Sequence, residues 1–455
     1  MSVIFSDEQQ FIIEKFKLGE NIFITGPGGT GKSFLIKYLV CLANENQKKI
    51  KVCALTGCAA ILLECNATTL HSFAGIGLAK KHINEVVDSV VSSKKKRKNW
   101  NNLDILIIDE VSMLSLKLLD IIDMIAKRVT KKRELPFGGI QIVFSGDFYQ
   151  LPPVGDDDIE SCQFCFESQL WNQLFKPENQ IELTKIFRQT DKEYVKILNK
   201  LRVGKISNNG INTLKQCTQK NIDKANPTII LPRKNEADKI NQYNFNKLDS
   251  KEEYEYNIKE VSLEELPLSK EQKDAYDNSS DYLKKESFEQ LKNSLMVEHS
   301  FKLRIGTKVM CIINMDVSSE FPIVNGSQGE VIEFKDGFPI VKFKNGYTNI
   351  IRPHIWSSDI LGAVAIKQIP LIYSWAITIH KAQGITLDEA LIDVGSGIFE
   401  CGQSYVALSR VKSLEGLFLK NFDANKIKVN KKVKDFYTNL QANQINYSLI
   451  HSCKC

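Results

Sequence analysis

Apolar and polar residues alternate in blocks along the first half of the chain, and the block lengths predict its secondary structure. Four short apolar runs have the length of buried strands, and three longer stretches carry apolar residues at helical spacing. The strand runs are Asn21–Thr25, Lys51–Leu55, Ile105–Ile108 and Ile140–Ser145, and the helical stretches are Ser6–Leu18, Ser33–Leu42 and Met113–Val129. Strands separated by helices in this way predict an α/β fold with a parallel sheet covered on both faces.

The pattern changes in the second half of the chain. Residues Asp249–Glu298 are highly charged and poor in strand formers, and we interpret them as a surface excursion or flexible insertion, not a core element. Short strand-like runs joined by glycine-bearing turns follow from Gly306 and predict a small β-barrel. The strand-like run Ala390–Val394 and a helix that starts at Gln403 then return to the α/β pattern.

Composition is typical of a soluble, intracellular globular protein. The chain has 455 residues, of which 43% are hydrophobic and 25% charged, and this length suggests about three domains. No apolar run is long enough to span a bilayer, and the N-terminus lacks the features of a secretion or mitochondrial signal. We therefore expect the 11 cysteines to be reduced thiols, including those in Cys162–Cys165 and His451–Cys455.

Basic residues are in slight excess, and two short runs concentrate them. The net charge is +6, and the runs are Lys94–Lys98 and Lys131–Arg133. Lys94–Lys98 has three interpretations: a solvated loop, a contact with nucleic acid, or a nuclear import signal. The sequence does not separate them, so a nuclear location stays open.

A glycine-rich segment between the first predicted strand and the following helix carries the strongest chemical signal. Residues 26–33 read GPGGTGKS and fit the phosphate-binding pattern GxxxxGK[ST] at every fixed position. Glycines let backbone N–H groups approach phosphate oxygens, and the helix N-terminus adds positive potential. We expect Lys32 to contact the terminal phosphates and Ser33 to bind magnesium. The rest of the loop around the nucleotide would be formed by Gly26, Gly28, Gly29, Thr30 and Gly31.

Two acidic residues follow the apolar run Ile105–Ile108. Phosphoryl transfer depends on positioning and on neutralisation of charge more than on covalent chemistry. We therefore expect Asp109 to hold magnesium and Glu110 to orient or deprotonate the attacking water.

Three further polar residues are candidates for the same reaction. Gln150 follows the strand that ends near Ser145 and could sense the γ-phosphate. Arg188 and Arg410 could stabilise the transition state, because a guanidinium stays charged and binds phosphate bidentately. Each arginine alone would more often form a surface salt bridge.

Taken together, these segments resemble one helicase family. The matching strings occur in the order GPGGTGKS, LTGCAAILL, TTLHSFAGIGL, IIDEVSML, PFGGIQIVFSGDFYQLPPV, ELTKIFRQ, YSWAITIHKAQGITLDEALIDV and GQSYVALSR. They closely resemble the Pif-type DNA helicases, RecD-like members of superfamily one, class B, from Phe5 to about Leu417.

The resemblance implies an activity and its partners. Such helicases use ATP and magnesium to move 5′-to-3′ on single-stranded DNA, and they unwind tailed duplexes, forks and often G-quadruplexes. Roles in replication, repair or recombination would follow. We expect a monomer, with a dimer on DNA as the alternative.

The resemblance also implies roles for individual residues. Gln9 would read adenine, although Ser6 and Gln9 also fit a helix capping box. Gln383 and Gly384 would contact the nucleotide. Single-stranded DNA would lie along residues whose hydroxyls bond phosphates and whose rings stack on bases. These residues are Thr56, Thr69, His71 and Phe73 in the first motor, and Thr378, His380 and Lys381 in the second. A position in the core is the alternative for Phe73.

The implied domain plan has two RecA-like motor domains. The first would span residues 1–187, with an inserted wedge at about 65–101, and the second 188–455, with a charged insertion at about 250–300 and a small β-barrel at about 319–372. In this plan the basic run Lys94–Lys98 would face duplex DNA.

Two rival functions remain. Asn246–Asp249 fits the NKxD guanine motif of GTPases, although the preceding Ala237–Phe245 is polar and helical in rhythm instead of an apolar strand. A DNA-binding ATPase that clamps without unwinding fits as well, because the motifs report hydrolysis and not its coupling to movement.

Overall fold

Two compact units make up the structure, a computed structural model that describes residues 5–63, 65–77, 79, 82–155, 159–222, 227–249, 252–295, 297–315, 323–358 and 361–452. The first unit contains Met1–Leu214, Ile398–Leu414 and Asp423–Cys455, and the second contains Lys215–Gly397 and Glu415–Phe422. The chain therefore leaves the first unit twice and returns to it twice.

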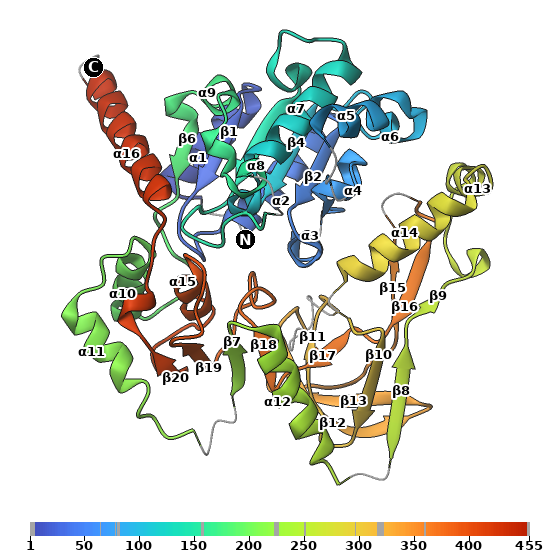
Figure 1. The fold of residues 1–455 in the computed structure, drawn as a ribbon, viewed down its shortest axis with the longest axis vertical. Helices are drawn as coiled ribbons and strands as arrows, with labels where there is room; N and C mark the ends of the chain where they lie inside the picture. Colours follow the sequence, from blue (N-terminus) through green and yellow to red (C-terminus); the bar gives the residue numbers. More distant parts are fainter. Residues whose placement is uncertain are drawn as a thin grey trace. The chain divides into compact units, whose positions relative to one another are not determined.

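A six-stranded parallel sheet organises the first unit, in the order β3-β2-β4-β5-β1-β6 (Figure 1). Its strands are β1 (Ile22–Thr25), β2 (Ile50–Ala54), β3 (Thr68–Thr69), β4 (Ile105–Asp109), β5 (Gln141–Ser145) and β6 (Gln180–Glu182). The four strands expected from apolar runs are all present, and the parallel sheet confirms the predicted α/β fold of this half.

The helices of the first unit include all three that the apolar spacing predicts. They are α1 (Asp7–Lys17), α2 (Lys32–Glu45), α3 (Gly57–Leu63), α4 (Leu70–Ala74), α5 (Ile83–Ser92), α6 (Lys94–Lys98), α7 (Leu116–Thr130), α8 (Ile159–Cys162), α9 (Leu170–Leu174), α10 (Lys192–Arg202), α15 (Gln403–Leu408) and α16 (Lys431–Ser452). Helix α11 (Asn208–Gln216) crosses the residue at which the two units divide.

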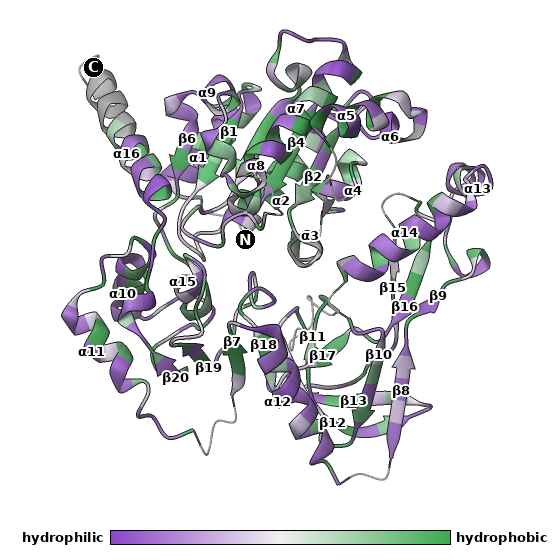
Figure 2. Ribbon diagram, in the orientation of Figure 1, coloured by the Kyte–Doolittle hydropathy of each residue, from purple (hydrophilic) through white to green (hydrophobic). Residues whose placement is uncertain are grey.

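Apolar side chains fill both faces of the six-stranded sheet. Along β1, Ile22 and Ile24 belong to one buried cluster and Phe23 to another, because successive side chains of a strand point to opposite faces. Helices α1 and α2 cover the first cluster, and α7 and α9 cover the second. Burial on both faces explains why these strands are continuous apolar runs and are mostly green in Figure 2.

The region predicted as a wedge packs partly into this core. Val87 of α5 is fully buried in the cluster that α7 covers, and Asp88 pairs with Arg128 of α7. The Oγ of Ser93 accepts a hydrogen bond from the Lys96 N–H at 3.4 Å and caps α6. The basic run is therefore a short helix, and its role in DNA contact or import stays a prediction.

A four-stranded parallel sheet lies in the second unit, in the order β18-β7-β19-β20. Its strands are β7 (Thr228–Leu231), β18 (Ala376–Thr378), β19 (Ala390–Val394) and β20 (Leu417–Phe422). Helix α12 (Lys234–Asn246) packs on β7 and β18, and it is purple along most of its length in Figure 2. The strand predicted at Ala390–Val394 and the helix predicted from Gln403 are both present.

Antiparallel strands form the remainder of the second unit. A five-stranded sheet has the order β14-β13-β12-β11-β17, from β11 (Lys308–Cys311), β12 (Gln328–Lys335), β13 (Phe338–Phe343), β14 (Thr348–Ile350) and β17 (Leu371–Tyr373). The predicted short strands are therefore present. Residues 319–322 and 359–360 of the predicted barrel lie outside the described residues, and closure into a barrel stays a prediction.

The charged segment Asp249–Glu298 forms helices and strands where it is described, and some of its residues are buried, which corrects its interpretation as a segment without core elements. It contains β8 (Glu253–Asn257), β9 (Lys259–Glu260), α13 (Lys270–Asp277) and α14 (Asp281–Ser294). Strand β8 pairs with β10 (Ser300–Arg304), and β9 pairs with β16 (Ala365–Gln368), which also pairs with β15 (His354–Ser357). Val261 and Leu266 are buried against Ala365. The alternative of a surface excursion agrees with α13, none of whose described residues is buried.

Across the part of the chain that the structure describes, none of the helices combines the length and the apolar character needed to cross a membrane.

Candidate nucleotide site and DNA-facing residues

The loop between β1 and α2 has a conformation that requires glycine. Gly26 has a φ of +136°, and a Cβ atom there would lie 2.3 Å from the Leu183 carbonyl oxygen. Gly29 has a φ of +86°, and its Cβ would lie 2.5 Å from the Cβ of Arg188. Both positions combine a left-handed backbone with close neighbours, so the loop can approach other groups only without side chains.

Lys32 is a half-buried cation at the start of α2. Its Nζ donates hydrogen bonds to the carbonyl oxygens of Gly26 at 2.7 Å and Pro27 at 3.0 Å. Burial lowers the pKa of Lys32, and the carboxylates of Asp147, Glu110 and Asp109 act in the opposite direction. The lysine therefore lies in a field of three acidic groups.

Asp109 is the last residue of β4 and Glu110 follows it, and both carboxylates act on Lys32. Asp109 is 5% exposed, and burial raises its pKa, while the Ser145 hydroxyl and Lys32 lower it. Glu110 has a φ of +56°, a left-handed conformation that is strained for a residue with a side chain. A hydroxyl from Ser33 and a carboxylate from Asp109 are oxygen donors of the kind that Mg²⁺ shares with nucleotide phosphates, so these residues fit that ion.

Two arginines far apart in the sequence converge on the glycine-rich loop. From the position of a Cβ on Gly28, the Arg188 Nη1 would lie 3.4 Å away and the Arg410 Nη2 3.6 Å away. The Gly28 N–H donates to the Tyr405 hydroxyl at 2.9 Å, and the Phe187 N–H donates to the Gly29 carbonyl at 2.7 Å. The arginines therefore belong to the same compact unit as Lys32.

Arg410 is held by its own helix. Its Nε donates to the Val406 carbonyl at 2.8 Å, and its Nη2 donates to the Ser409 hydroxyl at 2.6 Å. Burial and then the Arg188 guanidinium lower the pKa of Arg410 to about 9. An anion beside the two guanidinium groups would relieve this repulsion and raise the pKa of Arg410 again.

Gln9 takes part in the capping box, and its amide also reaches the loop. The Gln9 Oε1 accepts the Ser6 N–H at 3.1 Å, and the Ser6 Oγ accepts the Gln9 N–H at 3.4 Å. The Gln9 Nε2 would lie 3.2 Å from a Cβ on Gly31. The cap occupies the acceptor of Gln9 and leaves the donor beside the loop, so capping and adenine contact are compatible.

Several residues around this site were missed by the sequence analysis. Asp147 is fully buried, and the Arg202 Nε donates to both its carboxylate oxygens, at 3.1 Å and 2.9 Å. Arg202 also pairs with Glu182 at 2.9 Å. A buried aspartate needs a partner for its charge. The sequence does not indicate which basic residue supplies that partner. Gln150, three residues after Asp147, is also buried.

The threonines predicted to contact DNA share one local geometry. The Oγ1 of Thr56 accepts the Ala59 N–H at 3.2 Å, and the Oγ1 of Thr69 accepts the Ser72 N–H at 3.3 Å. Thr378, in the second unit, accepts the Lys381 N–H in the same way at 3.2 Å. Each oxygen thus caps a turn, and each hydroxyl hydrogen can still be donated to a phosphate oxygen.

Phe73 requires a correction. Its side chain is 3% exposed, and its ring packs 4.8 Å from that of Trp100. A ring buried in the core offers no face to a base, so the expected stacking of Phe73 on DNA is wrong for this packing. Its neighbour His71 is half-buried, and burial lowers the His71 pKa, which favours a neutral imidazole at neutral pH.

The remaining predicted contacts belong to the second unit. His380 is exposed, and Lys381, Gln383 and Gly384 are half-buried. Gly384 has a φ of +81°, which fits a turn. Their roles at the nucleotide and on DNA stay predictions.

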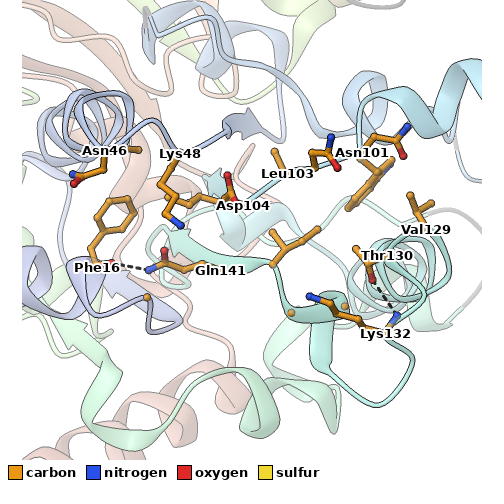
Figure 3. A pocket seen from close by; sticks show the side chains of 18 of the residues that line it. Phe16, Asn46, Lys48, Asn101, Leu103, Asp104, Val129, Thr130, Lys132 and Gln141 are labelled. Atoms are coloured by element: carbon orange, nitrogen blue, oxygen red, sulfur yellow. Dashed lines mark hydrogen bonds between the residues drawn. The ribbon is translucent and has the colours of Figure 1, made fainter.

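A separate recess lies at the opposite end of the first unit's sheet. It has a volume of about 1230 Å³ and is lined by the first residues of β4 and β5, Ile105 and Gln141. Figure 3 shows Gln141 bonded to Phe16, with Lys48 and Lys132 at the same recess. The glycine-rich loop follows the carboxyl end of β1, so this recess is distinct from the nucleotide site.

Comparisons with known proteins agree with these features. A family model described as PIF1-like helicase matches residues 4–211, and one described as DNA helicase Pif1, 2B domain, matches residues 286–334. The ATP-dependent DNA helicase PIF1 of Xenopus laevis is 34% identical over 443 residues, which cover 96% of this chain and 64% of that protein. The chain thus spans less than two thirds of the length of this relative.

Solved structures are similar over nearly the whole chain. The Pif1 helicase from Candida albicans has a TM-score of 0.74 and 30% identity, covering 96% of this chain and 100% of that one. The Pif1 helicase from Bacteroides in complex with ADP-AlF3 and ssDNA has a TM-score of 0.65 and 29% identity, covering 97% and 98%.

Proposed function

Because the chain belongs to the PIF1-like helicase family, we propose that it is an ATP-dependent DNA helicase. It would hydrolyse ATP with magnesium and use the energy to unwind duplex DNA from a single-stranded region. A similar helicase was solved with both a nucleotide analogue and ssDNA, which supports a nucleotide and single-stranded DNA as the ligands of this chain.

The observation that carries the proposal is the convergence of two guanidinium groups on the glycine-rich loop. Arg188 and Arg410 approach Gly28 to within 3.4 Å and 3.6 Å of its Cβ position. Arg410 is buried and Arg188 half-buried, and two like charges held in this way are costly unless an anion lies between them. A nucleoside triphosphate supplies that anion, and the charge that develops on its γ-phosphate during hydrolysis makes the two arginines suited to the transition state.

We assign the remaining roles from the motifs in which these residues lie. Lys32 holds the terminal phosphates, and Ser33 and Asp109 would hold Mg²⁺, which neutralises phosphate charge when it is bound. Glu110 orients the attacking water and accepts its proton. Gln150 senses the γ-phosphate.

The finer parts of the proposal concern DNA. Thr56, Thr69 and His71 in the first unit, with Thr378, His380 and Lys381 in the second, would contact a single strand. Movement would run 5′-to-3′, and forks or G-quadruplexes would be substrates. The plan of two motor domains that divide near residue 187, with a wedge at 65–101 and a barrel at 319–372, belongs to this proposal.

The rival GTPase function has little support. Asn246–Asp249 follows α12, a helix, where a guanine motif would follow an apolar strand.

The test is hydrolysis and strand displacement with matched variants. We expect the chain to hydrolyse ATP faster with single-stranded DNA and to displace a strand from a tailed duplex. Lys32→Ala should abolish both activities and keep single-strand binding, while Lys17→Ala, at an exposed position of α1, should change neither. Hydrolysis that persists in Lys32→Ala, or a clear preference for GTP, would refute the proposal. DNA-stimulated hydrolysis without displacement would favour a clamp.

A further inference from the structure

The C-terminal helix α16 inserts an aromatic side chain into the first unit, beyond the segments that resemble helicase motifs. Tyr437 is 2% exposed and belongs to the same buried cluster as Phe23 of β1. The neighbouring Phe436 packs 4.5 Å from Phe166 and 5.3 Å from Phe148, ring centroid to ring centroid. Residues 431–442 of this helix are thus anchored in the core.

The hydroxyl of Tyr437 meets two segments at once. It lies 2.5 Å from the Oγ1 of Thr25, accepts the Phe148 N–H at 3.2 Å, and donates to the Asp147 Oδ1 at 3.3 Å. A phenol has one hydrogen to donate and accepts through its lone pairs. Because that hydrogen goes to Asp147, the Thr25 hydroxyl donates to Tyr437.

The Tyr437 ring is also held by packing. It stacks on the Tyr149 ring, with centroids 4.5 Å apart and planes at 15°. The Arg202 guanidinium lies 4.8 Å from the Tyr149 ring and 5.2 Å from the Tyr437 ring while it holds Asp147. The orientation of the hydroxyl is therefore fixed by packing as well as by hydrogen bonds.

The two segments that meet at this hydroxyl are those that lead into the nucleotide site. Thr25 directly precedes Gly26, the first residue of the glycine-rich loop. Asp147 opens the segment that ends at Gln150, and its charge acts on Lys32. Burial raises the pKa of Tyr437 well above its ordinary value, so the phenol stays protonated at neutral pH.

We propose that Tyr437 is a positioning residue for ATP hydrolysis, which sets the glycine-rich loop relative to the Asp147–Gln150 segment through one shared hydroxyl. The inference rests on the proposed ATPase activity. It adds that the C-terminal helix is part of the hydrolytic site's support, although it lies outside the residues that match the family model at 4–211.

The experiment compares two hydroxyl deletions on facing rings. Tyr437→Phe keeps the ring stack and removes all three hydrogen bonds, and Tyr149→Phe removes a hydroxyl that has no hydrogen-bond partner among the described residues. We expect kcat for ATP hydrolysis to fall about tenfold in Tyr437→Phe, since a buried N–H and a carboxylate each lose a partner. The KM for ATP should stay within about twofold, and Tyr149→Phe should keep the kcat of the unchanged protein.

A double-mutant cycle separates positioning from general stability. Thr25→Val removes the partner hydroxyl with little change of shape, and its effect on kcat should not add to that of Tyr437→Phe. Additive losses, an unchanged kcat in Tyr437→Phe, or a loss matched by Tyr149→Phe would overturn the inference. If Tyr437→Phe folds poorly by thermal unfolding, Thr25→Val alone decides, because an unchanged kcat there has the same meaning. Absence of ATPase activity in the unchanged protein would instead refute the proposed function.

Discussion

Charge at the nucleotide site is balanced residue by residue within the first unit. Lys32 faces three carboxylates, Asp147 is neutralised by Arg202, and Arg188 and Arg410 share the glycine-rich loop. Burial, and then the charge of Arg188, lower the pKa of Arg410 to about 9. The two arginines therefore form a local excess of positive charge beside the glycine-rich loop, where a triphosphate would place its terminal phosphate.

This excess predicts the behaviour of Arg410 variants. Arg410→Ala should lower ATP turnover by about 10³-fold or more, as expected for a lost arginine finger, while nucleotide binding survives. The ATP turnover of Arg410→Lys should lie between that of Arg410→Ala and that of the unchanged protein, because an ammonium keeps the charge but lacks the bidentate fork. Steady-state turnover and fluorescent-nucleotide titration measure the two properties. Near-normal turnover in Arg410→Ala would make the arginine purely structural.

Residues on contiguous motifs could be predicted from the sequence, and residues defined by distant contacts could not. The pattern GPGGTGKS identifies Lys32 because loop, lysine and helix start are fixed within eight positions. Tyr437 contacts Asp147 from 290 positions away, and no local pattern marks such a pair. Phe73 was misassigned because an aromatic residue in a polar motif looks the same whether its ring faces DNA or Trp100.

At the scale of elements, the start of α1 combines a helix cap with a predicted contact to adenine. The capping box uses the oxygen of Gln9 and leaves its amide nitrogen beside Gly31. Gln9→Glu keeps an acceptor for the Ser6 N–H but has no N–H to donate, so the KM for ATP should rise about tenfold with little loss of stability. Ser6→Ala should cost about 1 kcal/mol of stability and leave KM unchanged. ATPase kinetics and urea unfolding distinguish the two variants. Equal KM values for ATP in both variants would exclude a contact between Gln9 and adenine.

The charged segment Asp249–Glu298 shows where composition misled the sequence analysis. Strand β8 reads EYEYN, and its tyrosines alternate with exposed glutamates, which is a strand pattern of period two. Tyr254 packs 4.5 Å from Phe334, and the Tyr256 hydroxyl donates to the Gly337 carbonyl at 2.8 Å. The alternation is present in the sequence, but the high density of charged residues led to the interpretation of the segment as an insertion.

Burial of side chains within this segment predicts a loss of stability on substitution that a flexible insertion would not show. Leu266 is 8% exposed and packs with Val261 and Ala365. Leu266→Ala should destabilise the protein by about 2–5 kcal/mol, as for other leucines removed from a core. Glu264→Ala, two residues away and exposed, should stay within about 0.5 kcal/mol. Urea unfolding followed by tryptophan fluorescence measures the stability of both variants. Equal unfolding midpoints for the two variants would mean that Leu266 adds no more stability than an exposed residue and that the segment is a flexible insertion.

For the whole molecule, the path of the chain links the nucleotide site to both units. Arg410 and Tyr437 lie in the two returns to the first unit, and each return follows a strand of the second unit, β19 and β20. The chain thus connects the two units covalently at four points, two of which lead into the segments that carry these residues. The motif GQSYVALSR identifies Arg410, but no motif marks Tyr437, and neither residue carries information about the direction of movement.

Direction is thus the property that must be measured on the complete chain. Family membership predicts that ATP and magnesium will support strand displacement from a duplex with a 5′ single-stranded tail and not from its 3′-tailed counterpart. The reason is that a motor loads on the tail and reaches the junction only if it moves towards it. Both substrates should stimulate hydrolysis, since each offers a single strand, so ATPase rates serve as the loading control, and Lys32→Ala should displace neither strand. Displacement from the 3′-tailed duplex alone would reverse the assigned polarity, and stimulated hydrolysis without displacement from either would leave a DNA-dependent ATPase that is not a helicase.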